Sequence, residues 1–467
     1  MINEPPLAEP PKPAAPWILS LLGAVAGCAT LVPVGGILGS SGPLWLKSID
    51  SVGRVSGTDY LLVGVLATVL ATVVALLTVR WWPWLLTVGA ATAMGGVGGV
   101  IAATAGQPTM NPADTATPNL LLLAGVAAAG FALALIGVLG AAQQLVASGR
   151  AGLGALVAGL AVSVRFFGFG LTTTTGGDAQ QRQLLVFLGV GLAGGIIATI
   201  GSLFGRGTAR PGTVGGRHVA LAGGVAALLP LVPVLIGFTN SVHPTTGWVV
   251  DVAGLLVLGG TIALAVWSGR GALPAALVAS LTIIGLTGPL LLTTITVGMK
   301  GIDTGARSAP IWPAFAGGLV VGGLLALPRR RAWLAAGGCV LAGGFVLVAL
   351  TGMQATWLKH IPVQLTVGVL VAVPTLAVAS AAGSAGARGR LVVALGPLFG
   401  GFMVAGDLLE RRASGGGVAH DLQYTFAGFS FGLSTLMVLA GLVLLVAAVL
   451  LGTLIADRRE VAAVQPD

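Results

Sequence analysis

Charged residues are scarce in this sequence: they make up 8% of the 467 residues, whereas 55% are hydrophobic and the mean hydropathy is +0.99. So few polar side chains cannot cover the surface of a water-soluble globule, which excludes a soluble globular protein. The alternating segments of about ten residues that form a transmembrane β-barrel are also missing. The class that remains is all-α, a polytopic bundle of membrane helices.

Cysteine and histidine are rare as well, with two and four residues. Cys28 and Cys339 both lie within apolar runs, which indicates no disulfide framework, and no histidines have metal-ligand spacing. There is no G-x-x-x-x-G-K-[ST] phosphate loop, and no break between apolar runs reaches the roughly 50 residues that an inserted domain needs. We therefore expect no metal, no other cofactor and no enzymatic activity.

Apolar runs long enough to cross about 30 Å of hydrocarbon recur along the chain, separated by short polar breaks. They predict fourteen helices: 17–38, 60–80, 83–105, 118–142, 152–171, 183–204, 218–238, 246–267, 272–297, 311–328, 332–351, 363–384, 391–406 and 427–456.

The positive residues set the predicted orientation of these helices. The net charge of +9 comes from arginines and lysines placed singly or in small groups in the breaks, which indicates membrane topology and not nucleic-acid binding. With the N-terminus inside, every internal break on the inner side has an arginine, and most acidic residues fall outside. Both termini are thus expected in the cytoplasm, and the high glycine and alanine content suggests a bacterial inner membrane.

The fourteen predicted spans divide into units. We expect a disordered cytoplasmic tail, a six-helix half, a central pair of helices, a second six-helix half and a short cytoplasmic tail, at 1–16, 17–205, 206–270, 271–456 and 457–467.

This arrangement resembles the fourteen-span drug:proton antiporter branch of the major facilitator superfamily. The segment from Gly269 to Leu350 is similar to the ninth to eleventh spans of that family, and ALGPLFGGFMVAGDLLERR, Ala394 to Arg412, is similar to its glycine/proline motif. The resemblance implies a transporter of two rocking halves, with Arg329, Arg330 and Arg331 at a cytoplasmic gate turn. The acid that the family has in that turn is absent here.

Ionisable residues within spans are costly and therefore functional candidates. Arg165, in VSVRFFGFG, is predicted to bind an anionic group in a central cavity; the alternative is an arginine that reaches the outer interface beside an aromatic belt. Asp251 is the one carboxylate predicted within a span. Since burial raises the pKa of a carboxylate, it is the candidate for proton coupling, with a solvated helix start as the alternative.

Uncharged residues add to the candidate site. Gln143 and Gln144, at the inner end of the fourth predicted span, and Gln364, at the outer end of the twelfth, could line a polar cavity, although helix-end capping or interfacial hydration explains them equally well. Prolines and glycines within spans allow kinks and close helix approach, and therefore hinges: Pro289, Gly396, Pro397, Gly400 and Gly401.

Three functions compete. The first is a secondary transporter that exports a lipophilic or amphipathic small molecule by alternating access. The second is a non-transporting, transporter-like membrane subunit or lipid-handling scaffold, which requires a membrane protein partner. The third, a polytopic transferase of lipid-linked substrates, would need paired acids on an early outer loop, where Asp50 and Asp59 are candidates by position alone.

Overall fold

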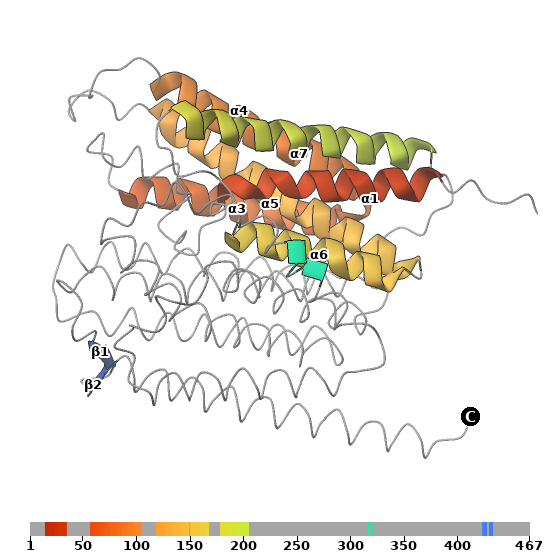
Figure 1. Cartoon of the computed structure of the whole chain (residues 1–467). Helices are drawn as coiled ribbons and strands as arrows, with labels where there is room; N and C mark the ends of the chain where they lie inside the picture. Colours follow the sequence, from red (N-terminus) through yellow and green to blue (C-terminus); the bar gives the residue numbers. More distant parts are fainter. Residues whose placement is uncertain are drawn as a thin grey trace, which may run out of the picture.

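The computed structural model describes residues 15–34, 57–104, 118–148, 150–167, 178–204, 316–317, 319–320, 423–426 and 429–432 (Figure 1). Its elements are α1 (Ala15–Gly27), η1 (Cys28–Val34), α3 (Gly57–Leu77), η3 (Val79–Trp81), α4 (Trp82–Thr104), α5 (Pro118–Ala147), α6 (Ala151–Phe167), α7 (Asp178–Phe204), β1 (Gln423–Phe426) and β2 (Phe429–Gly432). The two labelled η are 3-10 helices.

Three stretches in the described part of the chain are long and apolar enough to cross a membrane: Val79–Ala103, Leu121–Leu145 and Gln181–Phe204. Each has 24 or 25 residues, more than the about 20 that the hydrocarbon core requires. The predicted class, a polytopic bundle of membrane helices, is confirmed. The count of fourteen spans and the division into halves stay predictions.

Two prolines lie at defined positions of the helices: one begins α5 and the other lies within the 3-10 helix η1. Pro118 is the first residue of α5, a position where a helix needs no backbone N–H and where the fixed φ of proline suits the first turn. Pro33 lies inside η1 and cannot donate a backbone hydrogen bond. This segment runs as an α-helix to Gly27 and continues as a tighter 3-10 helix to Val34.

The helices alternate in direction. Trp82, at the start of α4, donates a hydrogen bond to Gln144, near the end of α5, so these helices are antiparallel. Trp17, near the start of α1, lies against Arg150, which precedes α6. We call the end of the bundle that holds these four residues the tryptophan end.

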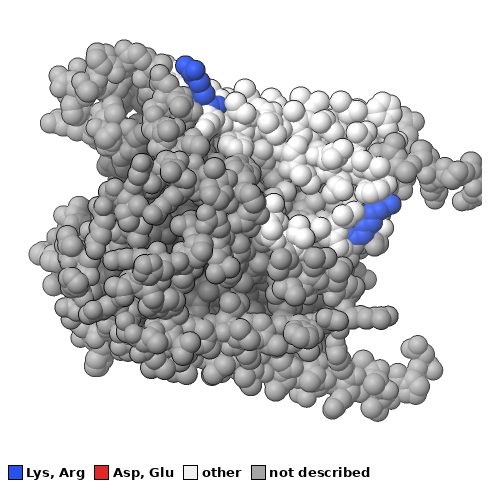
Figure 2. All heavy atoms as spheres, viewed as in Figure 1, with Lys and Arg blue, Asp and Glu red and all other residues white. Residues whose placement is uncertain are grey.

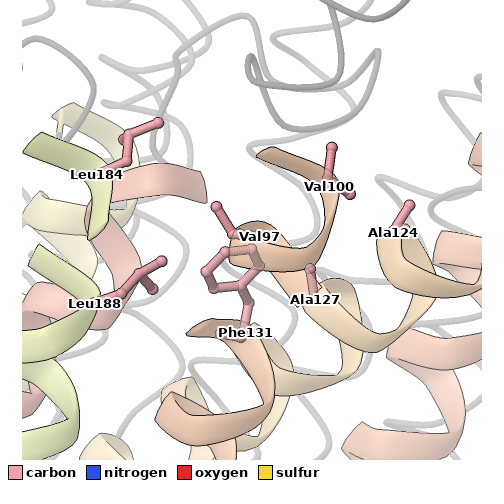
Figure 3. Packing of buried hydrophobic residues seen from close by; sticks show 8 residues of the cluster. Val97, Val100, Ala124, Ala127, Phe131, Leu184 and Leu188 are labelled. Atoms are coloured by element: carbon pink, nitrogen blue, oxygen red, sulfur yellow. The ribbon is translucent and has the colours of Figure 1, made fainter. Parts of the chain in front are cut away.

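The apolar core lies between α4, α5 and α7. Figure 3 shows the Phe131 ring of α5 beside Val97 of α4, with Leu184 and Leu188 of α7 across from them. The complete cluster consists of Ala93, Val97, Val100, Ala124, Ala127, Phe131, Leu184 and Leu188. Residues from three helices close this core, so α4 is packed between α5 and α7.

Glycine and alanine bring the backbones of α4 and α5 close together. A Cβ atom on Gly96 would lie 2.5 Å from the backbone nitrogen of Ala127, and one on Gly89 would lie 2.5 Å from that of Ala134. A backbone atom cannot rotate away as a side chain can, so only glycine fits at these two positions. We call this contact the α4–α5 seam; such small-residue contacts are typical of membrane helices.

A second seam joins α1 and α7. A Cβ atom on Gly194 would lie 2.5 Å from the backbone nitrogen of Gly27, and one on Gly23 would lie 2.6 Å from that of Ala198. These pairs run in opposite order along the two helices, which makes α1 and α7 antiparallel. In both seams a backbone, and not a large side chain, forms the contact surface.

The six spans predicted for residues 17–204 coincide with the described helices, but their ends differ. The prediction ends the fourth span at 142, whereas α5 continues to Ala147. It starts the sixth at 183, whereas α7 starts at Asp178. The predicted end of the fifth span, 171, lies outside the described residues.

One predicted helix is wrong at its start. Residues 429–432, assigned to the last span from 427, form strand β2, which pairs antiparallel with β1 and places Tyr424 opposite Phe431 and Phe426 opposite Phe429. The reason is local: within each strand aromatic residues alternate with small or polar ones, a period of two.

Candidate functional site

Three polar side chains are buried in the described bundle: Thr30, Gln143 and Thr199. A buried polar group without a hydrogen bond costs free energy, so the partners of each one decide whether it is structural or available for a ligand.

Thr199 is satisfied by a contact between α7 and α4. Its hydroxyl lies 2.8 Å from the Thr87 hydroxyl and donates to the Pro83 carbonyl oxygen at 3.2 Å. Thr87 also donates to that carbonyl at 2.9 Å, along its own helix. Since one carbonyl and two hydroxyls satisfy one another, this cluster joins two helices and has a structural role.

Gln144 is also engaged within the bundle. Its side-chain oxygen accepts a hydrogen bond from the indole nitrogen of Trp82. The Trp82 side chain is itself buried, and it reaches this position because Gly140, one turn earlier on α5, leaves room: a Cβ atom there would lie 2.6 Å from the Trp82 Cβ. Gln144 therefore holds α4 against α5.

Gln143 differs from its neighbour. Its side chain is 0% exposed, and neither the amide oxygen nor the amide nitrogen has a hydrogen-bond partner within the described structure. It lies on the face of α5 that also carries Leu139 and Ile136, one and two turns earlier, and both are buried. A buried amide whose oxygen and nitrogen both lack hydrogen bonds destabilises the folded state, because each unpaired atom costs free energy.

The position of Gln143 differs from that of an exposed residue at a helix end. The helix continues to Ala147, so Gln143 lies a full turn inside it, and its side chain is closed to solvent. The prediction that Gln143 lines a polar cavity stays a prediction: the described structure shows an unpaired amide with Leu139 and Ile136 on the same face of its helix.

Thr30 in η1 has the second unpaired buried side chain: its hydroxyl has no partner among the described residues. It packs directly against Gly191 of α7, where a Cβ atom would lie 2.8 Å from the Thr30 backbone nitrogen. Close packing of two helices accounts for this position, so we assign it to the α1–α7 seam and not to a ligand.

Charged side chains among the described residues lie only at the ends of the bundle. The Arg150 guanidinium lies 4.3 Å from the Trp17 ring centre, and the Arg80 guanidinium lies 5.6 Å from that of Trp81. Figure 2 shows basic side chains at both ends of the described helices on the face in view, with uncharged side chains between them. Arg80 and Arg150, both predicted inside, share the tryptophan end, whereas Arg182 lies near the start of α7, at the opposite end.

Arg165 lies in α6, fourteen residues after its start, and its side chain is outside the described part. Gln143 lies four residues before the end of α5. At 1.5 Å per residue, the two positions are separated by about 15 Å along the bundle axis. Gln143 and Arg165 are therefore too far apart to contact the same small chemical group.

The other predicted site residues lie outside the described residues. They are the binding candidate Gln364, the coupling candidate Asp251, and the gate and hinge candidates Arg329, Arg330, Arg331, Pro289, Gly396, Pro397, Gly400 and Gly401. Among the residues described, no group of three or more histidine, cysteine, aspartate or glutamate side chains could hold a metal ion.

Sequence reasoning missed Trp82 and Thr199. The sequence does not distinguish Trp82 from its neighbour Trp81, because only the burial of the Trp82 ring separates the core residue from the exposed one. Thr199 is one threonine in an apolar run, and its partner Pro83 is 116 residues away.

No protein-family model and no curated protein matches the chain. Among solved structures, the chain is similar to the proton:xylose symporter XylE of the major facilitator superfamily, bound to 6-bromo-6-deoxy-D-glucose. The likeness has a TM-score of 0.45 and 12% sequence identity, and covers 93% of this chain and 95% of that one. A likeness at this level fixes neither the fold nor the function of this chain.

Proposed function

We propose that this chain is a secondary transporter that exports a lipophilic or amphipathic small molecule across a bacterial inner membrane by alternating access. The observation that carries the proposal is Gln143, an unpaired amide closed to solvent inside a bundle of membrane helices. A stable structure retains such a group at a cost of about 1–3 kcal/mol. A function that supplies its partner in another conformation accounts for that cost.

Alternating access supplies this partner because rocking of two helix bundles opens and closes a site between them. We place the two halves at 17–205 and 271–456, with 206–270 as a central pair. In this proposal Gln364 and Arg165 provide further polar contacts for the substrate. The gate is formed by Arg329, Arg330 and Arg331, and the hinges by Pro289, Gly396, Pro397, Gly400 and Gly401.

An amphipathic substrate fits the spacing of the candidates. Gln143 lies near the tryptophan end, and Arg165 lies about 15 Å farther along the axis. A molecule with a polar group at one end and an apolar body could meet the first position and then the second as it moves. The tryptophan end is proposed to face the cytoplasm, since Arg80 and Arg150 lie there.

Export against a gradient requires coupling. We assign it to Asp251, because it is the one carboxylate that the sequence places within a predicted span, and a carboxylate can take up and release a proton. Asp251→Asn keeps the shape of the side chain and removes its titration, so this variant is expected to lose accumulation against a gradient while it retains exchange of substrate down a gradient.

A second candidate is a non-transporting membrane scaffold that binds a protein partner. The observation that favours it is the pair of glycine seams, which hold four helices at backbone contact and leave little freedom within the half. It predicts co-purification of a partner and no flux by the chain alone.

Accumulation of fluorescent amphiphiles in cells tests the proposal. Cells that produce the wild-type protein, Arg165→Ala, Gln143→Leu or an empty vector are compared with and without a protonophore, and Thr92→Val serves as a control because its exposed hydroxyl donates only along its own helix. Protonophore-sensitive export that is lost in Arg165→Ala and Gln143→Leu supports the transporter. Wild-type cells that match the empty vector across the panel refute it and favour the scaffold.

A further inference from the structure

The chemistry of Gln143 restricts what can bind there. A carboxamide has an acceptor oxygen and a donor nitrogen on the same carbon, and in Gln143 both lack a partner among the described residues. An anion could accept from the nitrogen but would leave the oxygen unpaired. A cation could donate to the oxygen but would leave the nitrogen unpaired.

The surroundings of Gln143 on its own helix also disfavour a charged ligand. The described charged side chains are Arg80, Arg150 and Arg182, and two of them lie against tryptophan rings at the tryptophan end. The neighbours of Gln143 along its helix face, Leu139 and Ile136, are apolar and buried. A ligand at Gln143 would thus lose its hydration among apolar neighbours, which costs a charged group more than an uncharged one.

Two other polar side chains of the described bundle do have partners. Gln144 has Trp82 as its donor, and Thr199 has Thr87 and Pro83. These three contacts come from helices that already pack against one another. Gln143 lacks such a contact although it lies in the same turn of α5, so its lone amide is not a general property of this part of the bundle.

From these observations we infer that Gln143 binds the uncharged head of the transported molecule, a group with a donor and an acceptor side by side, such as a carboxamide, lactam or urea. Such a group forms two parallel hydrogen bonds with the carboxamide and satisfies both of its atoms. This inference rests on the proposed function, since Gln143 is closed to solvent and meets a ligand only after the bundle opens. Gln143 lies about 6 Å from the end of α5, so that opening is at the tryptophan end.

Three probes with one apolar body and different heads test the inference: 2-naphthamide, 2-naphthoate and 2-naphthylmethylammonium. Equilibrium binding is measured to the full chain in lipid nanodiscs and corrected for partition into empty nanodiscs. The wild-type protein is expected to bind 2-naphthamide at least about tenfold more tightly than either charged probe, because only the amide pairs both atoms of Gln143.

Gln143→Leu and Gln144→Leu are the matched variants. Gln143→Leu is expected to lose the preference for the amide while it unfolds at or above the wild-type denaturant concentration, since leucine removes an unpaired amide. Gln144→Leu loses the bond from Trp82 and is expected to be less stable, yet to keep the preference. Equal affinity of the wild-type protein for all three probes overturns the inference, and so does an unchanged preference in Gln143→Leu.

Flux of the probes into proteoliposomes separates this inference from the proposed function. An amide preference in binding without flux of any probe refutes transport and leaves the ligand class standing. Flux of the probes without an amide preference leaves transport standing and refutes the ligand class.

Discussion

Two adjacent glycines of α4 allow a sharp test of the α4–α5 seam. A Cβ atom on Gly96 would lie 2.5 Å from the backbone nitrogen and 2.8 Å from the Cα atom of Ala127. A Cβ atom on Gly95 would have no atom of the described structure within 4 Å. Gly96→Ala and Gly95→Ala therefore make the same chemical change in the same helix, one inside the seam and one outside it.

The expected difference in the free energy of unfolding follows from this geometry. Both variants gain the same helix propensity of alanine over glycine, about 1 kcal/mol in water, and this gain cancels in the comparison. Only Gly96→Ala must separate two backbones, and overpacking of this kind costs about 1–3 kcal/mol. We expect Gly96→Ala to be less stable than Gly95→Ala by that amount, and Gly95→Ala to be at least as stable as the wild-type protein.

The assay is unfolding of the full chain in dodecyl maltoside by increasing fractions of sodium dodecyl sulfate, followed by tryptophan fluorescence. The midpoint of Gly96→Ala is expected at a lower dodecyl sulfate fraction than that of Gly95→Ala. If the two midpoints coincide, the backbones of α4 and α5 are not in contact at this position, and the reasoning from the seam is wrong.

Two further predictions use the same unfolding assay. Thr199→Val, which removes the hydroxyl that reaches Pro83 across the helix interface, is expected to lose about 0.6 kcal/mol, whereas Thr92→Val is expected to lose less; an equal loss would contradict the interhelical role. Because the Arg150 guanidinium lies over the Trp17 ring, a double-mutant cycle of Arg150→Gln and Trp17→Leu should give a coupling energy of about 0.5–1 kcal/mol, and additive effects would contradict that contact.

The helices of residues 15–204 could be predicted because each is an apolar run bounded by a polar or proline-containing break, and a membrane helix needs about 20 such residues. Their ends could not. Two consecutive glutamines look like the end of a span, yet α5 continues through Gln143 and Gln144 to Ala147, because α4 and the rest of the bundle cover them. The local sequence does not show which residues the neighbouring helices will bury.

The candidate site was predictable in part for the same reason. The residue type and position of Gln143 were evident, but its difference from Gln144 depends on Trp82, which is 62 residues away. The hairpin at 423–432 shows the reverse case. There the alternation of aromatic residues indicates strands. The apolar run that follows nevertheless led to the prediction of a helix from residue 427.

The two glycine seams also determine how helices α1, α4, α5 and α7 can move. Glycine and alanine have no side-chain rotamers to lose, so holding α4 against α5 and α1 against α7 costs little conformational entropy. Contact between backbones allows no gradual sliding, because every intermediate position would bring a backbone against the next side chain. Any conformational change must therefore carry each pair of helices as a rigid body and place the bending in the segments outside the seams.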